Sequence, residues 1–355
     1  RAAVALCLPF VTEVWQVYVL IFVLQSASAA FTPAFQATIP EVLPDEKDYT
    51  RALSLSRLAY DLESLISPAL AAALLTIISF HSLFGGTVIG FLVSSALVVS
   101  VVLPALSKTE RRSVYERTTR VLRLYLATPR LRGLLAICLS VSAAGSMVIV
   151  NTVVIVQSTF GLTQESTALA LAAFGGGSML AALFLPKLLD TIPDRPVMLA
   201  GAAVLIAGLL AASAVDSIRT LLPLWCLLGI GYSIAQTPSG RLLRRSAHAE
   251  DRPALFAAHF ALSHAAWLIT YPLAGWLGAT IGLSAAALCL ALLATSGLAA
   301  AMVLWPSDDN AEIEHDHDDL PADHPHLAEG ARRGGHRHTH AVVIDRLHPE
   351  WPSRP

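Results

Sequence analysis

The chain has 355 residues, of which 55% are hydrophobic and only 14% are charged, and its mean hydropathy is +0.61. A soluble domain usually carries about 25% charged residues, so this composition excludes an ordinary water-soluble protein and is typical of a membrane protein. The net charge of −2 is unevenly distributed along the chain. Residues 308–355 hold eleven of the 26 acidic residues but only five of the 24 Lys and Arg. The remainder of the chain is therefore basic.

Apolar segments long enough to cross a bilayer follow one another along the chain. A spanning helix needs about 20 residues, and no charged residue occurs in 133–157 or in 253–307. The second stretch is too long for one helix, and the segment 278–282 offers a turn that divides it. The sequence predicts ten crossings, of which the first is incomplete: 2–12, 14–33, 53–79, 83–106, 133–157, 166–186, 197–216, 220–239, 254–277 and 281–305.

Lys and Arg are concentrated in every second loop between these segments. Basic residues are retained on the cytoplasmic side of a membrane. The sequence therefore predicts that these loops and the C-terminal tail are cytoplasmic. The residues that carry this signal are Lys108, Arg111, Arg112, Arg117, Arg120, Arg123, Arg130 and Arg132, then Lys187 and Arg195, then Arg241, Arg244, Arg245 and Arg252.

Two halves of the chain share landmarks at matching distances. Thr32 and Pro68 are 36 residues apart in the first half, and Thr237 and Pro272 are 35 apart in the second. Such internal similarity is typical of transporters built from two related helix bundles. The stretches "TPAFQATIPEVLPDE" and "RALSLSRLAYDLESLISPALAAALL" resemble the fourth-to-fifth helix region of the drug-exporter-like branch of the major facilitator superfamily. "PKLLDTIPDRP" is similar to a cytoplasmic motif of that family and contains Asp190, Asp194 and Arg195, of which Asp190 matches the motif's acid.

The resemblance implies an all-α membrane protein of two pseudo-symmetric bundles, with about ten of twelve transmembrane helices present. We expect an N-terminal bundle at 1–106 that comprises helices three to six, with the first two helices lying upstream of this chain. We expect a cytoplasmic inter-bundle loop at 107–132, a C-terminal bundle of helices seven to twelve at 133–305, and a tail at 306–355 rich in His and Asp.

Ionisable groups inside a bilayer cost at least about 2.5–3.5 kcal/mol each and are therefore candidates for function. Asp61 and Glu63 lie in the predicted fifth helix. Side chains two positions apart on a helix point about 200° away from each other, so these two cannot both face one cavity. The alternative for each is a structural bond to a neighbouring helix. His264 lies near the position equivalent to Asp61 in the second half, and histidine exchanges protons near neutral pH. The further candidates for transport or coupling are His259, Asn151 and Gln36.

Eight of the twelve histidines follow residue 306, and seven of them stand in three His-x-His clusters interleaved with aspartates. In an extended strand, alternate side chains share a face, and imidazole with carboxylate suits zinc, nickel or cobalt. A loosely bound divalent metal ion and a merely solvated tail both fit this composition. The candidate ligands are His315, His317, His324, His326, His336, His338 and His340.

Together these patterns predict a secondary active transporter, not an enzyme, that exports a small molecule in exchange for protons by alternating access. One alternative is a divalent-metal exporter that uses the histidine-rich tail, and another is a membrane metal sensor that transports nothing. We expect no required cofactor, no nucleic-acid partner, a monomer, and a multi-pass location in a bacterial inner membrane with a cytoplasmic C-terminus.

Overall fold

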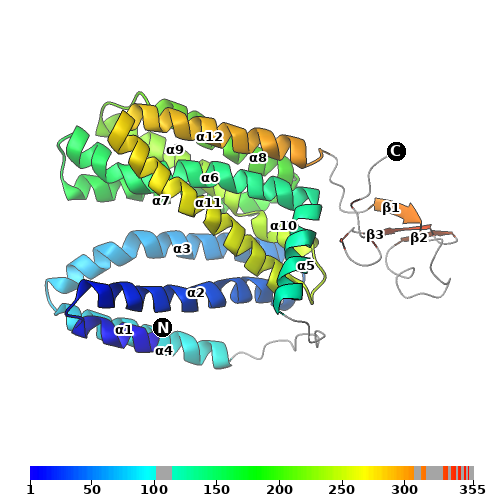
Figure 1. Cartoon of the computed structure of the whole chain (residues 1–355), viewed down its shortest axis with the longest axis horizontal. Coiled ribbons are helices and arrows are strands. Elements are labelled where there is room, and N and C mark those ends of the chain that lie inside the picture. The colour runs from blue at the N-terminus through cyan, green and yellow to red at the C-terminus, as the bar shows by residue number, and fades with distance from the viewer. Residues whose placement is uncertain are drawn as a thin grey trace.

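The computed structural model describes residues 1–100, 114–307 and, in the tail, 313–316, 331–334, 337–340, 343–344, 348 and 351. Side chains are not described at 64–65, 68–69, 72–73 and 114–117, nor at tail positions other than 339, 343, 344, 348 and 351. The chain is almost entirely helical, and its long helices run roughly parallel to one another (Figure 1).

The first half of the chain forms four helices: α1 (Ala2–Cys7), α2 (Val14–Val42), α3 (Glu46–Leu75) and α4 (Phe80–Ser100). A capping box between Glu13 and Gln16 begins α2, because each side chain bonds to a backbone N–H that the first turn leaves free. The Asp45 carboxylate accepts hydrogen bonds from the backbone N–H groups of Lys47 and Asp48 at the start of α3. The ends of these two helices are therefore specified locally.

The second half forms eight helices: α5 (Val114–Ala127), α6 (Pro129–Val153), α7 (Gln164–Leu189), α8 (Asp194–Ala212), α9 (Ile218–Gln236), α10 (Ser239–Arg245), α11 (Arg252–Ile281) and α12 (Leu283–Leu304). A π-helical turn, Val154–Thr159, continues α6. Gly282 lies between α11 and α12 with φ of 86°, a conformation that side chains other than glycine rarely adopt. The predicted division of the long uncharged stretch is thus confirmed at this residue.

Eight described helices are long and apolar enough to cross a membrane. The segment 2–12, which was predicted as an incomplete crossing, contains the short α1 and one 3-10 turn. The predicted crossing 53–79 falls largely within α3, part of which lies outside the described side chains, so this crossing stays a prediction. The predicted loop 107–132 is wrong in part, because residues 114–127 form the amphipathic helix α5 and α6 begins at Pro129.

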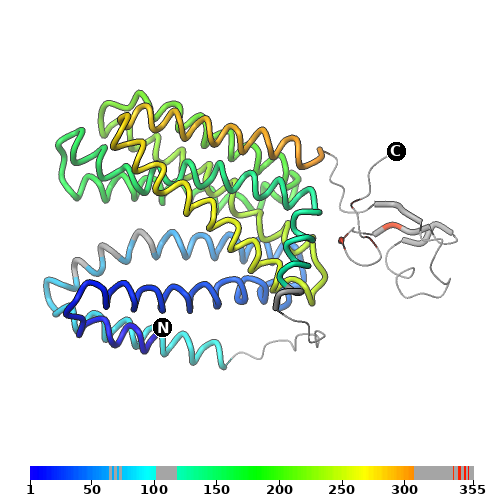
Figure 2. Tube along the Cα trace, in the orientation of Figure 1, coloured from blue at the N-terminus to red at the C-terminus, as the bar shows by residue number. Residues whose placement is uncertain are grey.

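The helices form two groups, one of α1–α4 and one of α6–α9, α11 and α12 (Figure 1). The main hydrophobic core belongs to the second group and is centred on Trp225, Met147, Leu205 and Leu290. The tube in Figure 2 shows the two groups approaching at the end where α5, α10 and the start of α11 lie. Contacts between the groups run from α3 to α7 and from α2 to α10 and α11.

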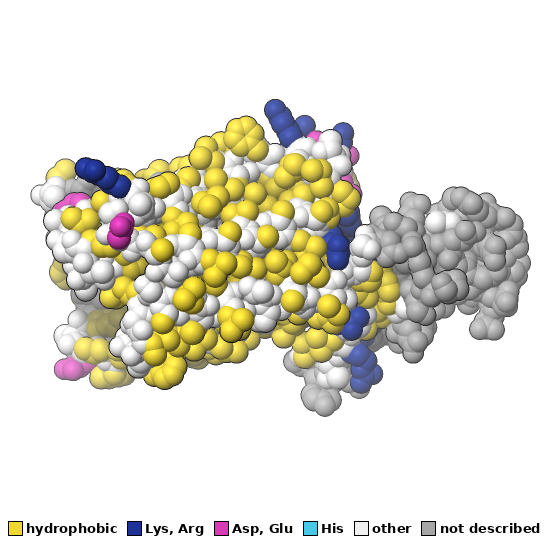
Figure 3. All heavy atoms as spheres, turned by 90° about the horizontal axis from the view of Figure 1, so that it is seen from above, with side chains coloured by type: hydrophobic (Ala, Val, Ile, Leu, Met, Phe, Trp, Pro, Cys, Tyr) yellow, Lys and Arg dark blue, Asp and Glu magenta, His cyan; other side chains and the backbone are white. Residues whose placement is uncertain are grey.

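The surface of the helical body separates apolar from charged side chains. Figure 3 shows a broad hydrophobic band with Lys, Arg, Asp and Glu gathered toward the two ends of the helices. Large apolar side chains such as Leu268, Leu292 and Val303 are at least 72% exposed. Exposure of apolar side chains is unfavourable in water but carries no such cost in the hydrocarbon of a bilayer. This surface therefore fits a hydrocarbon environment.

Part of the tail forms a small antiparallel sheet in the order β1-β3-β2. The strands are β1 (Ile313–Asp316), β2 (Ala331–Gly334) and β3 (Arg337–His340), and His315 is the register partner of His338. The all-helical description therefore holds for the membrane body and not for the tail. The strands do not test whether the tail binds metal or is only solvated, so both alternatives stay predictions.

Helices α7 and α9 approach so closely that their contact requires glycine. A Cβ at Gly229 would lie 1.9 Å from the carbonyl oxygen of Phe174, and one at Gly177 would lie 1.9 Å from that of Cys226. Small residues at such crossings let backbones pack directly, which is the main source of helix association in lipid.

We expect Gly229→Ala to lower the free energy of unfolding by about 3 kcal/mol, because the added methyl group collides with backbone that cannot rotate away. Thermal unfolding of the full-length protein in detergent measures the change. Gly176→Ala is the matched control, since a Cβ there meets nothing within 4 Å. Equal melting temperatures for the two variants would contradict the close packing.

Candidate functional site

A buried acidic residue joins the two helix groups in the middle of the membrane body. Asp61 of α3 is 3% exposed, and one of its carboxylate oxygens lies 2.8 Å from a terminal nitrogen of Arg57 on the same helix. Its other oxygen accepts a hydrogen bond of 2.5 Å from the hydroxyl of Ser178 on α7. The Nε of Arg57 also donates to Ser178, at 3.2 Å. We call Arg57, Asp61 and Ser178 the central triad.

The charge of Arg57 is further stabilised by aromatic rings. Its guanidinium lies 4.5 Å from the ring centre of Tyr232 on α9 and 5.6 Å from that of Tyr60. Tyr232 in turn contacts Phe174 edge-on, at 5.5 Å between ring centres. A cation over an aromatic face gains about 0.5–2 kcal/mol, with the larger values where water is absent. The triad is therefore enclosed by side chains from both helix groups.

The sequence accounts for one part of this arrangement. Asp61 and Glu63 were predicted to point apart, and Glu63 is exposed whereas Asp61 is buried. Arg57 was missed, although its position four residues before Asp61 on one helix is a recognisable ion-pair spacing. Ser178 had no signal in the sequence, because its contact spans 117 residues of chain.

A second polar cluster joins the groups at the end of the helices where Arg241, Arg244, Arg245 and Arg252 lie, which we call the basic end. Arg241 of α10 lies 2.7 Å from a carboxylate oxygen of Glu46 and 3.0 Å from one of Asp194. It also donates to the hydroxyl of Thr50, at 2.8 Å. Arg245 contacts both of the same carboxylates, with 2.9 Å to Asp194. Because Glu46 and Thr50 belong to α3, these arginines connect the two groups.

Further polar contacts close the basic end. Arg252 at the start of α11 pairs with Glu41 of α2, and Arg244 donates to the carbonyl oxygen of Pro44. The Arg244 guanidinium also lies 5.2 Å from the ring centre of Tyr49. The contacts of the basic end therefore leave little room between the groups, and a small polar crevice of about 190 Å³ lies among them.

The three residues of the predicted cytoplasmic motif take different positions. Asp194 is 3% exposed and forms the ion pairs with Arg241 and Arg245. Arg195 donates to the carbonyl oxygens of Trp305 and Met302 at the end of α12, at 2.8 and 3.3 Å. Asp190 is exposed after the last turn of α7. Of the three motif residues, Asp194 is therefore the one that holds the arginines that reach Glu46 of α3.

The two membrane histidines differ in their surroundings. His259 is buried, and its Nδ1 lies 2.9 Å from the hydroxyl of Tyr125 on α5, so this pair fastens α5 to α11. Burial raises the pKa of the Tyr125 hydroxyl well above its usual range, which keeps the proton available for this hydrogen bond. His264 is exposed, stacks on Phe260 and bonds to that residue's carbonyl oxygen. Neither histidine contacts the central triad.

The two uncharged candidates lie elsewhere. The Asn151 amide donates to the carbonyl oxygen of Ala274, at 3.2 Å, and so connects α6 to α11. Gln36 is exposed on α2.

The histidine-rich tail shows backbone order without a described metal site. His317, His324, His326 and His336 lie outside the described residues, and His315, His338 and His340 are described only as strand positions. Among the residues that the structure describes, no group of three or more His, Cys, Asp or Glu side chains could hold a metal ion.

Comparison with known proteins places the chain among membrane transporters. The sequence model of the Major Facilitator Superfamily matches residues 2–147 and 135–338, which together include nearly the whole chain. An uncharacterized MFS-type transporter of Bacillus subtilis, YfiS, is 27% identical over 193 residues, which cover 51% of this chain and 45% of that protein.

Macrolide efflux proteins match a shorter part of the chain. Macrolide efflux protein A of Enterococcus faecalis is 29% identical over 93 residues, which cover 26% of this chain and 28% of that protein. The protein of the same name from Streptococcus pyogenes is also 29% identical over 93 residues, or 26% of this chain and 23% of that protein. The chain thus spans less than half the length of the curated relatives it matches.

We expect Arg241→Gln to loosen the basic end, because it removes two ion pairs and leaves the buried Asp194 with Arg245 as its charged partner from this cluster. Spin labels at the exposed positions Lys47 and Ala249, one on each side of the contact, report the separation of the groups by double electron–electron resonance. A broadened distribution with a longer component is expected. Arg219→Gln, which removes an exposed arginine at the opposite end, should leave the distribution unchanged, and an unchanged distribution for Arg241→Gln would contradict the closure.

Proposed function

Because the chain belongs to the Major Facilitator Superfamily, we propose that the protein exports a small organic compound across a bacterial inner membrane in exchange for protons, with Asp61 as the proton-coupling group. The family relationship and the apolar helices support a multi-pass membrane transporter. The observation that carries the finer proposal is the central triad, in which a carboxylate of one helix group is bonded to a hydroxyl of the other.

The bond between Ser178 and Asp61 supplies a physical link between protonation and movement. The ionised carboxylate accepts hydrogen bonds from Ser178 and pairs with Arg57 at the same time. A protonated carboxyl group carries no charge and becomes a donor at one oxygen, so it loses most of its attraction for Arg57 and can no longer accept at every position. Proton binding therefore weakens the contact between α3 and α7.

The closed basic end supplies the other half of an alternating-access cycle. In this conformation, Arg241 and Arg245 hold α3 against α8 and α10. We infer that the basic end faces the cytoplasm, because Lys and Arg are retained there. The structure then corresponds to a state closed on the cytoplasmic side, from which a compound would leave to the outside. These ion pairs must break for this end to open. Hydration of the separated charges offsets part of the free-energy cost.

The relatives suggest a first compound to test. Proteins named for macrolide efflux share about a quarter of this chain's length at 29% identity. Erythromycin is therefore the first probe, and ethidium is a second probe of unrelated shape. Nothing in the described residues favours the alternative of a metal exporter or a metal sensor.

We expect cells that produce the full-length protein to accumulate less radiolabelled erythromycin or ethidium than control cells. Asp61→Asn should abolish this difference, because the amide is isosteric but cannot carry the proton. Glu63→Gln is the matched control, since this acid lies two residues away on the exposed side of α3 and should leave export within about twofold of the original protein.

Two results would contradict the proposal. Export by Asp61→Asn at the original rate, and with the original dependence on the pH gradient, would remove Asp61 from coupling. A full-length protein that changes the accumulation of neither probe nor of a wider panel of organic compounds would argue against export itself. Membrane abundance of each variant, measured on the same cells, separates loss of transport from loss of protein.

A further inference from the structure

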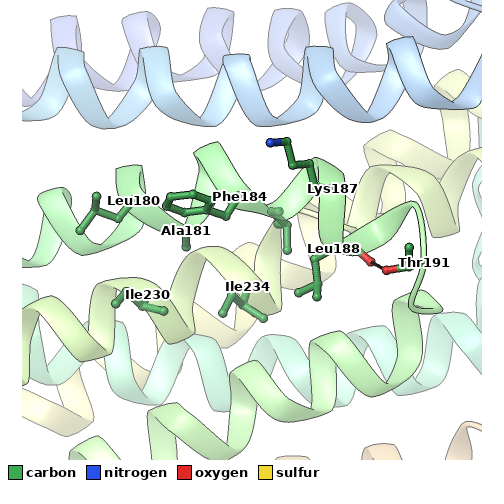
Figure 4. A pocket seen from close by; sticks show the side chains of 9 residues that line it. Leu180, Ala181, Phe184, Lys187, Leu188, Thr191, Ile230 and Ile234 are labelled. Carbon is green, nitrogen blue, oxygen red and sulfur yellow. Dashed lines mark hydrogen bonds between the residues drawn. The ribbon is translucent and has the colours of Figure 1, made fainter.

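An apolar groove lies between α7 and α9 near the basic end, and neither the central triad nor the closure of the basic end accounts for it. The groove has a volume of about 640 Å³. Its lining residues are Leu180, Ala181, Phe184, Leu185, Lys187, Leu188, Thr191, Ile230 and Ile234. Figure 4 shows Phe184 and Leu188 along α7, with Ile230 and Ile234 opposite them on α9.

The exposure of its lining residues places the groove on the membrane-facing surface. Ala181 and Leu185 form its buried floor, at 8% and 1% exposed. Leu180 and Phe184 are 49% and 68% exposed along its length. A hollow of this composition in contact with hydrocarbon favours an apolar chain as its occupant.

The groove has one charged lining residue, Lys187, which lies in the last turn of α7. Lys187 is exposed, and it forms no ion pair with any described residue. In Figure 4 its amine points away from Ile230 and Ile234 at the rim of the groove. Lysine side chains near helix ends extend toward the membrane–water interface. Lys187 is therefore placed where the headgroup of a lipid would lie.

The dimensions of the groove match one leaflet. Leu180 and Leu188 are separated by about 12 Å along α7, at 1.5 Å per residue. The hydrocarbon of one leaflet is about 15 Å deep, half of a core of about 30 Å. An acyl chain that enters beside Lys187 can thus follow the lining residues over most of its length while its headgroup stays at the interface.

We propose that this groove binds an anionic phospholipid from the leaflet at the basic end, with one acyl chain between α7 and α9 and the phosphate beside Lys187. The apolar lining gives affinity for any lipid chain, and the unpaired lysine gives preference for a negative headgroup. Juxtamembrane basic residues attract anionic lipids by a margin that corresponds to about a fivefold preference per residue.

Native mass spectrometry of the full-length protein, offered equal amounts of phosphatidylglycerol and phosphatidylcholine, tests the proposal. We expect one phosphatidylglycerol molecule to be retained about fivefold more than phosphatidylcholine. Lys187→Gln should bring the ratio close to one, and Lys187→Glu should bring it lower. Arg219→Gln is the matched control, because it removes an exposed arginine from the opposite end of the same helix group and should keep the original ratio.

Further measurements identify the occupant. Ala181→Leu fills the floor of the groove and should reduce retention of both lipids at this site, with thermal unfolding as the check that the variant is folded. Displacement of the lipid by millimolar glycerol phosphate would overturn the proposal in favour of a site for free phosphate compounds. An unchanged ratio in Lys187→Gln would overturn the proposal in favour of unspecific lipid binding. Loss of a dimer mass in Ala181→Leu, with lipid retention unchanged, would overturn it in favour of a second copy of the chain.

Discussion

A carboxylate withdrawn from water inside a bilayer must be paired, and the pairing of Asp61 is the interaction on which the account of this protein rests. An isolated charge at the centre of a membrane costs at least about 2.5–3.5 kcal/mol. Arg57 supplies the opposite charge from the same helix, and Ser178 supplies a hydrogen bond from the other helix group. Because part of the compensation comes from across the interface, the two groups cannot separate without changing the environment of this acid.

The basic end applies the same constraint with more charges. Asp194 is buried between Arg241 and Arg245, and these arginines reach across to Glu46. The Arg241–Asp194 pair is as deeply buried as the Arg57–Asp61 pair, whereas the Glu46 side chain, which belongs to the other helix group, is 46% exposed. The contact with Glu46 is therefore the part of the basic end that water can reach when the groups separate. The proposed lipid groove lies on α7, the helix that also carries Ser178, and so links the surrounding leaflet to the same element.

Much of this arrangement could be predicted from the sequence. Apolar runs and basic loops gave the order of the long helices, and the resemblance to the major facilitator superfamily agrees with the family match over residues 2–147 and 135–338. Helix geometry separated Asp61 from Glu63 correctly. The sequence could not show α5 as a helix, because a stretch rich in arginine is also typical of a loop, and its apolar face is recognised only once Tyr125 is seen packed beside His259. The contact of Ser178 with Asp61 and the contacts of Arg241 with α3 could not be predicted from the sequence, because they depend on how the helix groups pack.

Proton exchange by the purified full-length protein measures the coupling role of Asp61. At constant pH in weakly buffered detergent solution, addition of a transported compound should release or take up close to one proton per protein, because the ligand changes the contact between the helix groups and with it the proton affinity of Asp61. Asp61→Asn should abolish this exchange, and Glu63→Gln should preserve it. An exchange of the same size in Asp61→Asn would show that another group carries the proton and would contradict the role given to the central triad.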